Sequence, residues 1–196
     1  MRRLTVERSG SGPRLVLVHG FTQTGRSWRR IASDLAREHE VLAVDAPGHG
    51  GSSDLSASLV EGADLLVEAG GTATYIGYSM GARLALHAAL NRPEEVRRLV
   101  LVGGTAGIED TDERAARRRD DDALAEDIER NGVDAFLTRW LALPLFAGLR
   151  PDTVDLDDRH RNTAGGLASS LRHAGVGTQQ DLWPLLGTVA MPVLLV

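Results

Sequence analysis

The sequence predicts an α/β fold, with a mostly parallel sheet, helices on both faces and a helical cap insertion. Apolar runs of strand type alternate with stretches of helical periodicity along the first hundred or so residues. The run at 41–44 is continuously apolar, and those at 14–18 and 96–102 are apolar apart from Arg14, Arg97 and Arg98, as in strands buried on both faces. After Gly104 a long helical section interrupts this alternation, and an apolar strand returns only at Val193.

The first elements are a short strand, a turn, a buried strand and a helix. Residues 4–8 alternate as a strand, and residues 10–13 (GSGP) predict a hairpin turn into the buried strand 14–18. Apolar side chains recur with helical spacing over residues 28–37, with arginines on the other face. A second buried strand follows at 41–44.

The next section repeats this alternation. A loop rich in glycine and serine covers residues 45–53, and residues 55–68 have helical periodicity. A short strand at 74–77 leads into a helix rich in alanine and leucine at 80–91, and a buried strand follows at 96–102. Strands that alternate with helices imply crossover connections, so most of the sheet is expected to be parallel.

The pattern then changes. The chain is densely charged over residues 110–130 and stays helical and loop-like over residues 133–180. A helical insertion of roughly 80 residues is far longer than an ordinary connection, which indicates a lid or cap. We therefore divide the chain into a core at 1–108, a helical cap and return helix at 109–187, and a core strand at 188–196.

The composition excludes several classes of protein. The chain of 196 residues has no cysteine, and its 22 basic residues are all arginine, so disulfides, thiol nucleophiles, Schiff-base lysines and phosphate-loop lysines are excluded. A net charge of −5 argues against a broad basic face for nucleic acid. The apolar runs are far shorter than the ~18 residues of a membrane span, and the start lacks a signal core. We expect a cytoplasmic enzyme or binding domain with no nucleic-acid or membrane partner; the oligomeric state stays open.

One motif carries chemistry. Residues 77–81 (GYSMG) match G-x-S-x-G, with a strand before and a helix after, as the motif requires. This sharp turn exposes the Ser79 hydroxyl, and the helix directs its first amides toward developing negative charge. The amides of Met80 and Phe21 are the expected oxyanion donors. The alternative, a chance match in which Ser79 only caps the helix, is disfavoured by this context.

These features resemble the α/β-hydrolase superfamily over essentially the whole chain. More narrowly, the chain resembles the 2-succinyl-6-hydroxy-2,4-cyclohexadiene-1-carboxylate synthases of menaquinone biosynthesis. Three of the matching segments are partly generic to the superfamily and three sharpen the assignment: 18–28, 45–52 and 77–86, then 104–108, 113–118 and 136–140. Ala82 stands where family members usually have a second glycine, a mild departure.

The resemblance implies an elimination rather than a hydrolysis. In that family a proton is removed from a ring that carries carboxylates, a succinyl arm and an enolpyruvyl ether, and pyruvate leaves. Such a reaction requires a base, groups that hold several carboxylates, and donors for an enolate-type oxygen. The implied partner is a small polycarboxylate substrate, and the implied chemistry uses no cofactor and no metal.

The core contributes three candidate site residues besides the oxyanion amides. By resemblance Ser79, activated by a histidine, is the base that abstracts the proton. Tyr78 can hydrogen-bond a substrate oxygen, although an ordinary packed tyrosine is nearly as good an interpretation. Arg83 lies four residues after Ser79 on the same helix face, where it can pair with a substrate carboxylate.

The cap contributes three more candidates by resemblance. Arg117 matches a substrate-binding arginine, but the acids and arginines around it also fit a solvated helical face. Trp140 matches a pocket tryptophan, with ordinary cap packing as the alternative. Arg161 matches another carboxylate-binding arginine.

A hydrolase-type triad has the chain order serine, acid, histidine, and the last two are missing here. None of the six histidines occupies the expected place, and Asp181 precedes the last strand, residues 191–196, which we expect to be buried. We therefore expect a C-terminal truncation, with the acid and histidine beyond residue 196. This predicts little synthase activity in the isolated chain and a stability lowered by an exposed sheet edge.

Two other functions remain open. The first is a generic α/β-hydrolase esterase in which Ser79 is an acylated nucleophile. The second is a non-catalytic domain that keeps the fold without the triad. Release of pyruvate, as against cleavage of a short-chain aryl ester, separates the lyase from the esterase.

Overall fold

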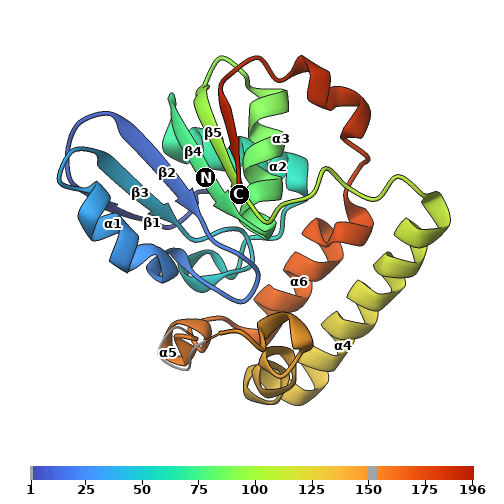
Figure 1. The fold of residues 1–196 in the computed structure, drawn as a ribbon. Coiled ribbons are helices and arrows are strands. Elements are labelled where there is room, and N and C mark those ends of the chain that lie inside the picture. The colour runs from blue at the N-terminus through green and yellow to red at the C-terminus, as the bar shows by residue number, and fades with distance from the viewer. Residues whose placement is uncertain (1, 150–153) are drawn as a thin grey trace.

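A computed structural model describes residues 2–149 and 154–196. A six-stranded sheet forms its centre, with the order β1-β3-β2-β4-β5-β6 (Figure 1). The strands are β1 (Val6–Ser9), β2 (Arg14–Val18), β3 (Glu40–Val44), β4 (Ala73–Tyr78), β5 (Val96–Val102) and β6 (Val193–Leu195). Only β1 runs antiparallel to its neighbour, so the predicted mostly parallel sheet is confirmed.

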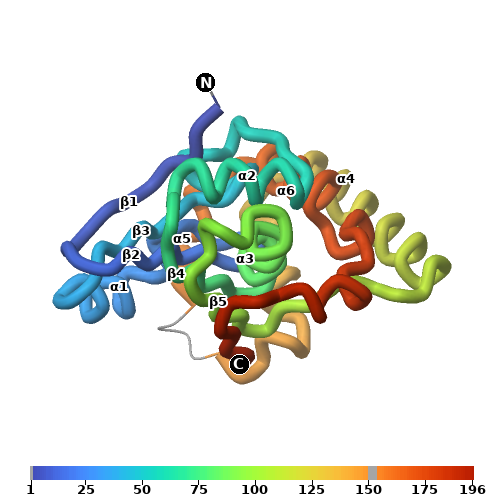
Figure 2. Tube along the Cα trace, turned by 90° about the horizontal axis from the view of Figure 1, so that it is seen from above, coloured from blue at the N-terminus to red at the C-terminus, as the bar shows by residue number. Residues whose placement is uncertain are grey.

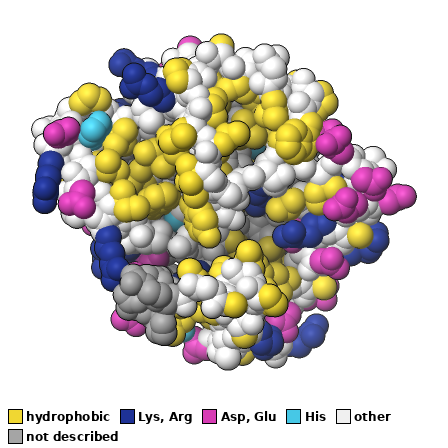
Figure 3. Space-filling view, viewed as in Figure 1, with side chains coloured by type: hydrophobic (Ala, Val, Ile, Leu, Met, Phe, Trp, Pro, Cys, Tyr) yellow, Lys and Arg dark blue, Asp and Glu magenta, His cyan; other side chains and the backbone are white. Residues whose placement is uncertain are grey.

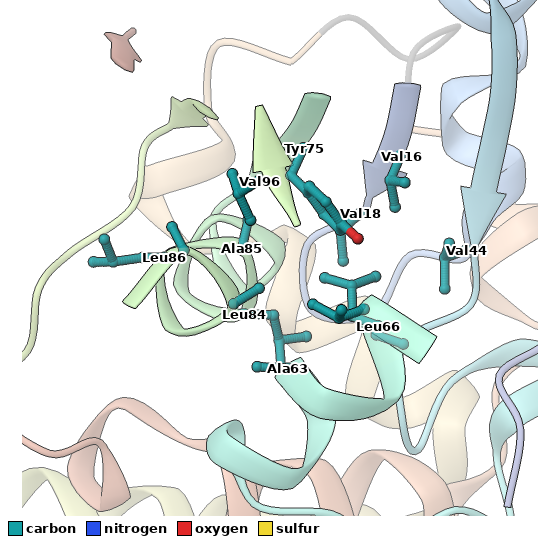
Figure 4. Packing of buried hydrophobic residues seen from close by; sticks show 14 of the residues in the cluster. Val16, Val18, Val44, Ala63, Leu66, Tyr75, Leu84, Ala85, Leu86 and Val96 are labelled. Carbon is teal, nitrogen blue, oxygen red and sulfur yellow. The ribbon is translucent and has the colours of Figure 1, made fainter. Parts of the chain in front are cut away.

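Helices cover both faces of this sheet. The helices are α1 (Arg29–Leu35), α2 (Leu59–Gly70), α3 (Met80–Asn91), α4 (Thr111–Leu141), α5 (Leu156–Arg159) and α6 (Ala164–Ala174). Successive side chains of β2 point to opposite faces: Leu15 and Leu17 lie in the cluster on the α1 side, and Val16 and Val18 in the cluster with α2 and α3. Figure 4 shows Val16 and Val18 close to Leu66 of α2. No helix of the described residues is long and apolar enough to cross a membrane.

Several elements have the predicted bounds, and one helix begins later. β2, β5 and α3 agree with the sequence residue for residue. α2 begins at Leu59 rather than residue 55, because Ser58 accepts a hydrogen bond from the Glu61 amide and Glu61 reciprocates at the Ser58 amide. This capping box fixes the helix start more sharply than the apolar periodicity does.

Residues 10–13 do not form the predicted hairpin. β1 pairs with β3, which lies between β1 and β2 in the sheet. The loop therefore crosses the beginning of β3, where the Glu40 amide donates to the Pro13 carbonyl over 3.2 Å. A Cβ on Gly10, whose φ is +69°, would lie 2.2 Å from the His39 carbonyl oxygen. Gly10 is therefore needed for this close crossing. A hairpin turn also favours glycine, so the sequence pattern does not distinguish the two.

The cap helices lie to one side of the sheet layers. α4 and α6 run beside each other in both views (Figures 1 and 2) and share a separate apolar cluster that includes Ile128, Phe136 and Leu167. The charged run predicted as a helical region forms the first part of α4, which kinks at Gly132. The core–cap division at residues 108 and 187 stays a prediction.

The last strand is exposed, which contradicts the prediction that residues 191–196 form a buried strand. β6 pairs with β5, but the exposed fractions of Leu194 and Leu195 are 57% and 73%. Among the described residues, β5 is the only strand paired with it. Figure 3 shows apolar side chains gathered on the face that carries β6. An apolar strand sequence specifies pairing, but burial also depends on what covers the strand.

Candidate active site

Ser79 sits on a strained turn between β4 and α3. Its φ is +52° and its ψ is −110°, and only two other described non-glycine residues, Thr22 and Asp155, have a positive φ. The Ser79 amide donates to the Val102 carbonyl over 2.8 Å, which holds the turn in place. The Ser79 side chain makes no cap hydrogen bond, so the alternative in which it only caps the helix is wrong.

The two glycines of the motif allow α3 to approach the sheet. A Cβ on Gly77 would lie 2.3 Å from the Gly81 carbonyl oxygen, and a Cβ on Gly81 would lie 2.2 Å from the Val18 carbonyl oxygen. Neither distance is possible for a real side chain, because carbon and oxygen atoms repel well before that separation. The motif is therefore a steric requirement of this strand–turn–helix junction.

The loop after β2 brings a second amide to the serine's neighbourhood. Within the described part of the chain, the amides of Phe21 and Met80 donate to no protein acceptor. Both are thus free to meet a ligand oxygen, as an oxyanion hole requires. Their role as oxyanion donors stays a prediction.

His19 anchors this loop and is not a base. The Ala46 amide donates to His19 Nε2 over 3.0 Å, so the ring carries its proton on Nδ1, which donates to the Gly20 carbonyl over 2.8 Å. Complete burial lowers the pKa of His19 to about 4, so the ring is neutral. Both ring nitrogens are engaged, which makes this histidine a structural link between two loops.

A cavity of about 270 Å³ lies between the serine turn and the cap. Residues from both regions line it. Those from the core include Phe21, Gln23, Tyr78, Ser79, Met80 and Arg83, and those from the cap include Arg117, Asp121, Trp140 and Arg159. Of the eight candidate residues, the structure thus brings seven together around one cavity, and the exception is Arg161.

Arg83 is a buried cation at the junction of core and cap. Its Nη1 donates to the Ala174 carbonyl at the end of α6 over 2.7 Å. Burial lowers the pKa of Arg83 to about 10, and the Asp121 carboxylate acts in the opposite direction. The guanidinium stays charged at neutral pH, in a setting where water screens it little.

Arg117 lies at the edge of the cavity. Its Nε donates to Asp121 Oδ1 over 2.9 Å, and 44% of the Arg117 side chain is exposed. Asp121 is buried and also accepts from the Gly177 amide over 3.1 Å. The neighbouring Arg118 is exposed and does not line the cavity, so the solvated-face interpretation fits Arg118 better than Arg117.

The structure places Arg161 outside the cavity and Arg159, two positions earlier, in its lining. Arg161 is exposed and lines a separate hollow beside Thr5 and Val6. Arg159 is buried, lines the cavity, and donates from Nε to the Val154 carbonyl over 2.9 Å. The chain turns at the end of the one-turn helix α5, so the two arginines face different surroundings. Sequence spacing does not distinguish them.

An aromatic group forms one wall of the cavity. The ring of Trp140 lies 5.6 Å from the rings of Phe21, Phe136 and Phe146, centroid to centroid. The Trp140 indole nitrogen is buried and has no hydrogen-bond partner among the described residues. A buried N–H of this kind is costly unless a ligand or water accepts from it. Tyr78 is 38% exposed and borders the same cavity.

The described residues supply no general base for the serine. No side chain among residues 2–149 and 154–196 forms a hydrogen bond with Ser79 Oγ. His49 is buried, directs Nδ1 to the Pro47 carbonyl oxygen over 3.0 Å, and has its pKa lowered by burial to about 3. The same described ranges contain no group of three metal-ligating side chains.

Comparisons with known proteins agree with this geometry. The model of the alpha/beta hydrolase fold family matches residues 13–163. A relative from Bacillus subtilis (strain 168), named putative 2-succinyl-6-hydroxy-2,4-cyclohexadiene-1-carboxylate synthase, is 33% identical over 93% of this chain and 71% of its own length. A synthase of the same name from Klebsiella pneumoniae is also 33% identical, over 87% of this chain and 70% of its own.

Solved structures show the same relationship. The structure of MenH from S. aureus has a TM-score of 0.85 and 27% identity, and the match covers 100% of this chain and 79% of that chain. A thermophilic esterase from Thermogutta terrifontis, solved with malate bound, has a TM-score of 0.81 and 24% identity, with 98% and 73% covered. The second likeness concerns the fold alone.

Proposed function

Because this chain belongs to the alpha/beta hydrolase fold family and has synthase relatives at 33% identity, we propose that it carries the site of a carbon–oxygen lyase. The reaction is the one named for those relatives, in menaquinone biosynthesis. A base removes a ring proton, the electron pair shifts through the ring, and the bond to the enolpyruvyl oxygen breaks. The departing enol takes up a proton and becomes pyruvate.

The observation that carries this proposal is the concentration of positive charge around the serine. Arg83, Arg117 and Arg159 line one cavity with Ser79, and Asp121 is the one acidic side chain that lines it in the described part of the chain. Guanidinium groups pair with carboxylates through parallel hydrogen bonds. A substrate with several carboxylates fits such a lining, whereas a neutral ester leaves these charges unpaired.

The three arginines differ in strength as anchors. Arg83 and Arg159 are 7% and 5% exposed, so a carboxylate that reaches them exchanges water for a charge pair in a poorly screened site. Arg117 is half-exposed and shared with Asp121, so it is the weaker and more adaptable partner. We assign the fixed carboxylates of the substrate to Arg83 and Arg159, and a guiding role at the cavity edge to Arg117.

The core supplies the groups for the reacting atoms. The amides of Phe21 and Met80 would stabilise the enolate-type oxygen as negative charge develops. The Trp140 indole and the Tyr78 hydroxyl are further donors in the cavity wall. Ser79 would take the ring proton once a base draws the proton from its hydroxyl. Neither His19 nor His49 is that base, because both rings are fully buried and directed to backbone groups rather than to Ser79.

The esterase is the second candidate, and one observation favours it. A serine on this turn, with two free amides nearby, is also the arrangement for acyl transfer. The absence of a base bonded to Ser79 among the described residues is what a non-catalytic domain would show.

The test compares two reactions in one preparation. The protein is incubated with the succinyl-enolpyruvyl-cyclohexene carboxylate, pyruvate is measured, and hydrolysis of an aryl acetate is followed in parallel. We expect pyruvate release that is slow, since the described residues supply no general base for Ser79, that Ser79→Ala abolishes, and that exceeds ester cleavage. Ester cleavage that depends on Ser79, without pyruvate, would establish the esterase instead. If neither product forms, calorimetry decides between a substrate site and a non-catalytic domain, since only the former binds the carboxylate substrate in a saturable way.

A further inference from the structure

Asp158 holds the loop that carries the Phe21 amide. The Thr24 amide donates to Asp158 Oδ2 over 3.0 Å, and the Thr24 hydroxyl donates to Asp158 Oδ1. Asp158 is 2% exposed, and 134 residues of chain separate it from Thr24. A buried carboxylate requires such donors. The loop after β2 therefore supplies the hydrogen-bond donors that the Asp158 carboxylate of α5 needs.

Asn162 makes a second link from the same segment. Its Nδ2 donates to the Thr22 carbonyl over 2.7 Å, and its Oδ1 accepts from the Gly50 amide over 3.0 Å. One side chain thus joins the loop that carries Phe21 to the glycine-rich loop after β3. Asn162 is 5% exposed, so water does not readily replace either bond.

Arg159 makes the third link, at the residue directly after Phe21. Its Nη1 donates to the Thr22 hydroxyl, and its Nε is occupied by the Val154 carbonyl. Thr22 is fully buried and has a φ of +69°, a conformation that a β-branched residue keeps only when its surroundings hold it. The three side chains Asp158, Arg159 and Asn162, which we name the α5 clamp, provide that hold.

We propose that the α5 clamp positions the Phe21 amide and links it to substrate binding. Arg159 has two contacts of different kinds: it lines the cavity, and it holds Thr22. Its Nη2 has no partner among the described residues, so a carboxylate in the cavity would bind the same guanidinium end that holds Thr22. Carboxylate binding at Arg159 would then change the position of the Phe21 amide through Thr22. Asp158 and Asn162 are positioning residues, and the substrate-linked part of the proposal rests on the proposed function.

The first test measures the clamp without ligand in the full chain. Thr22→Val removes the hydroxyl that accepts from Arg159 and keeps the shape, whereas Thr22→Ser keeps the hydroxyl. Asn162→Asp removes the donor to the Thr22 carbonyl and keeps the acceptor for Gly50. By NMR we expect the Gln23 and Thr24 amides to exchange with solvent about tenfold faster in Thr22→Val and Asn162→Asp than in Thr22→Ser. Exchange in β4 and α3 should be unchanged.

The second test adds succinate as a carboxylate probe. The Trp140 indole N–H reports occupancy of the cavity, and the Phe21 amide reports the loop. In the wild type and Thr22→Ser both signals should move together, whereas in Thr22→Val the indole signal should move and the Phe21 signal should stay. A merely structural role for Thr22 does not produce this separation at equal occupancy.

The outcomes separate the two proposals. Equal amide exchange in Thr22→Val and Thr22→Ser overturns the clamp, whatever succinate does. An equal response of Phe21 in all variants overturns the link to substrate. If the indole signal never responds to succinate, the carboxylate site of the proposed function fails, and faster exchange in Thr22→Val still supports the clamp.

Discussion

The core and the cap contribute to one cavity in different ways. In the core, residues 77–81 carry the geometry: Gly77 and Gly81 let α3 meet β2, and Ser79 is held on the turn between them. The cap is positioned by contacts across long stretches of chain, such as the bond from Arg83 of the core to Ala174 of the cap over 91 residues of sequence. The core thus supplies rigid backbone donors and the guanidinium of Arg83, and the cap supplies Arg117 and Arg159.

The two regions also differ in how they bury polar groups. The core buries neutral imidazole rings, since His19 and His49 are fully buried and stay uncharged at neutral pH. The cap keeps charged groups and pairs them, as Asp121 does with Arg117. The core should therefore respond to sterics and acid, and the cap to charge substitutions.

The largest effect is expected from Gly81→Ala. The new Cβ would have to displace the Val18 carbonyl, 2.2 Å away, so the free energy of unfolding should fall by at least about 3 kcal/mol. The matched control in the same helix, Ala82→Gly, should cost only about 1 kcal/mol. Denaturant unfolding measures both, and equal losses would contradict the steric account of the turn.

The second largest effect should be a loss of stability at low pH that comes from the buried histidines of the core. The folded pKa values of His19 and His49 are about 4 and about 3, below the value of about 6.5 in an unfolded chain. The unfolded state therefore binds more protons below pH 6.5, so stability is intact above that pH and is lost as the pH falls toward 4. At pH 5 the loss should be on the order of 2 kcal/mol per histidine.

A pair of variants checks this pH dependence. His49→Gln should flatten the slope of unfolding free energy against pH between 6.5 and 4, because it removes one buried site. His173→Gln, an exposed histidine of the cap, should leave the slope unchanged. The same slope in His49→Gln and the wild type would contradict the assignment to buried rings.

A charge substitution in the cap should weaken carboxylate binding. Arg159→Gln should raise the Kd for succinate at least about tenfold, because it removes a buried guanidinium from the cavity. Arg161→Gln should change it by less than about twofold, since Arg161 lies outside the cavity. Isothermal calorimetry measures both, and the reverse ranking would restore the sequence-based choice of Arg161.

The smallest effect is expected from Gly165→Ala in the cap. A Cβ there meets nothing within 4 Å, and alanine is the better helix former, so unfolding should cost about 0.5 kcal/mol more. Thermal unfolding measures it. A loss as large as that of Gly81→Ala would erase the proposed difference between the two regions.

The sequence predicted features that depend on local residues, and it failed for features that depend on distant contacts. The bounds of β2, α3 and β5, and the serine turn, follow from local pattern and local sterics, so the sequence contained them. The hairpin at 10–13 and the burial of residues 191–196 were wrong, because each depends on a distant partner. For the same reason the sequence did not show that Arg161 lies outside the cavity. The α5 clamp was missed for the same reason, since nothing local links Asp158 to Thr24.

The central claim is that charge around the cavity selects a polycarboxylate substrate for the Ser79 turn. The most direct measurement is a calorimetric titration of the protein with the succinyl-enolpyruvyl-cyclohexene carboxylate and, separately, with its methyl ester. We predict saturable binding of the free acid, weakened by added salt, and no measurable binding of the ester. Equal affinity for the two compounds would contradict the claim.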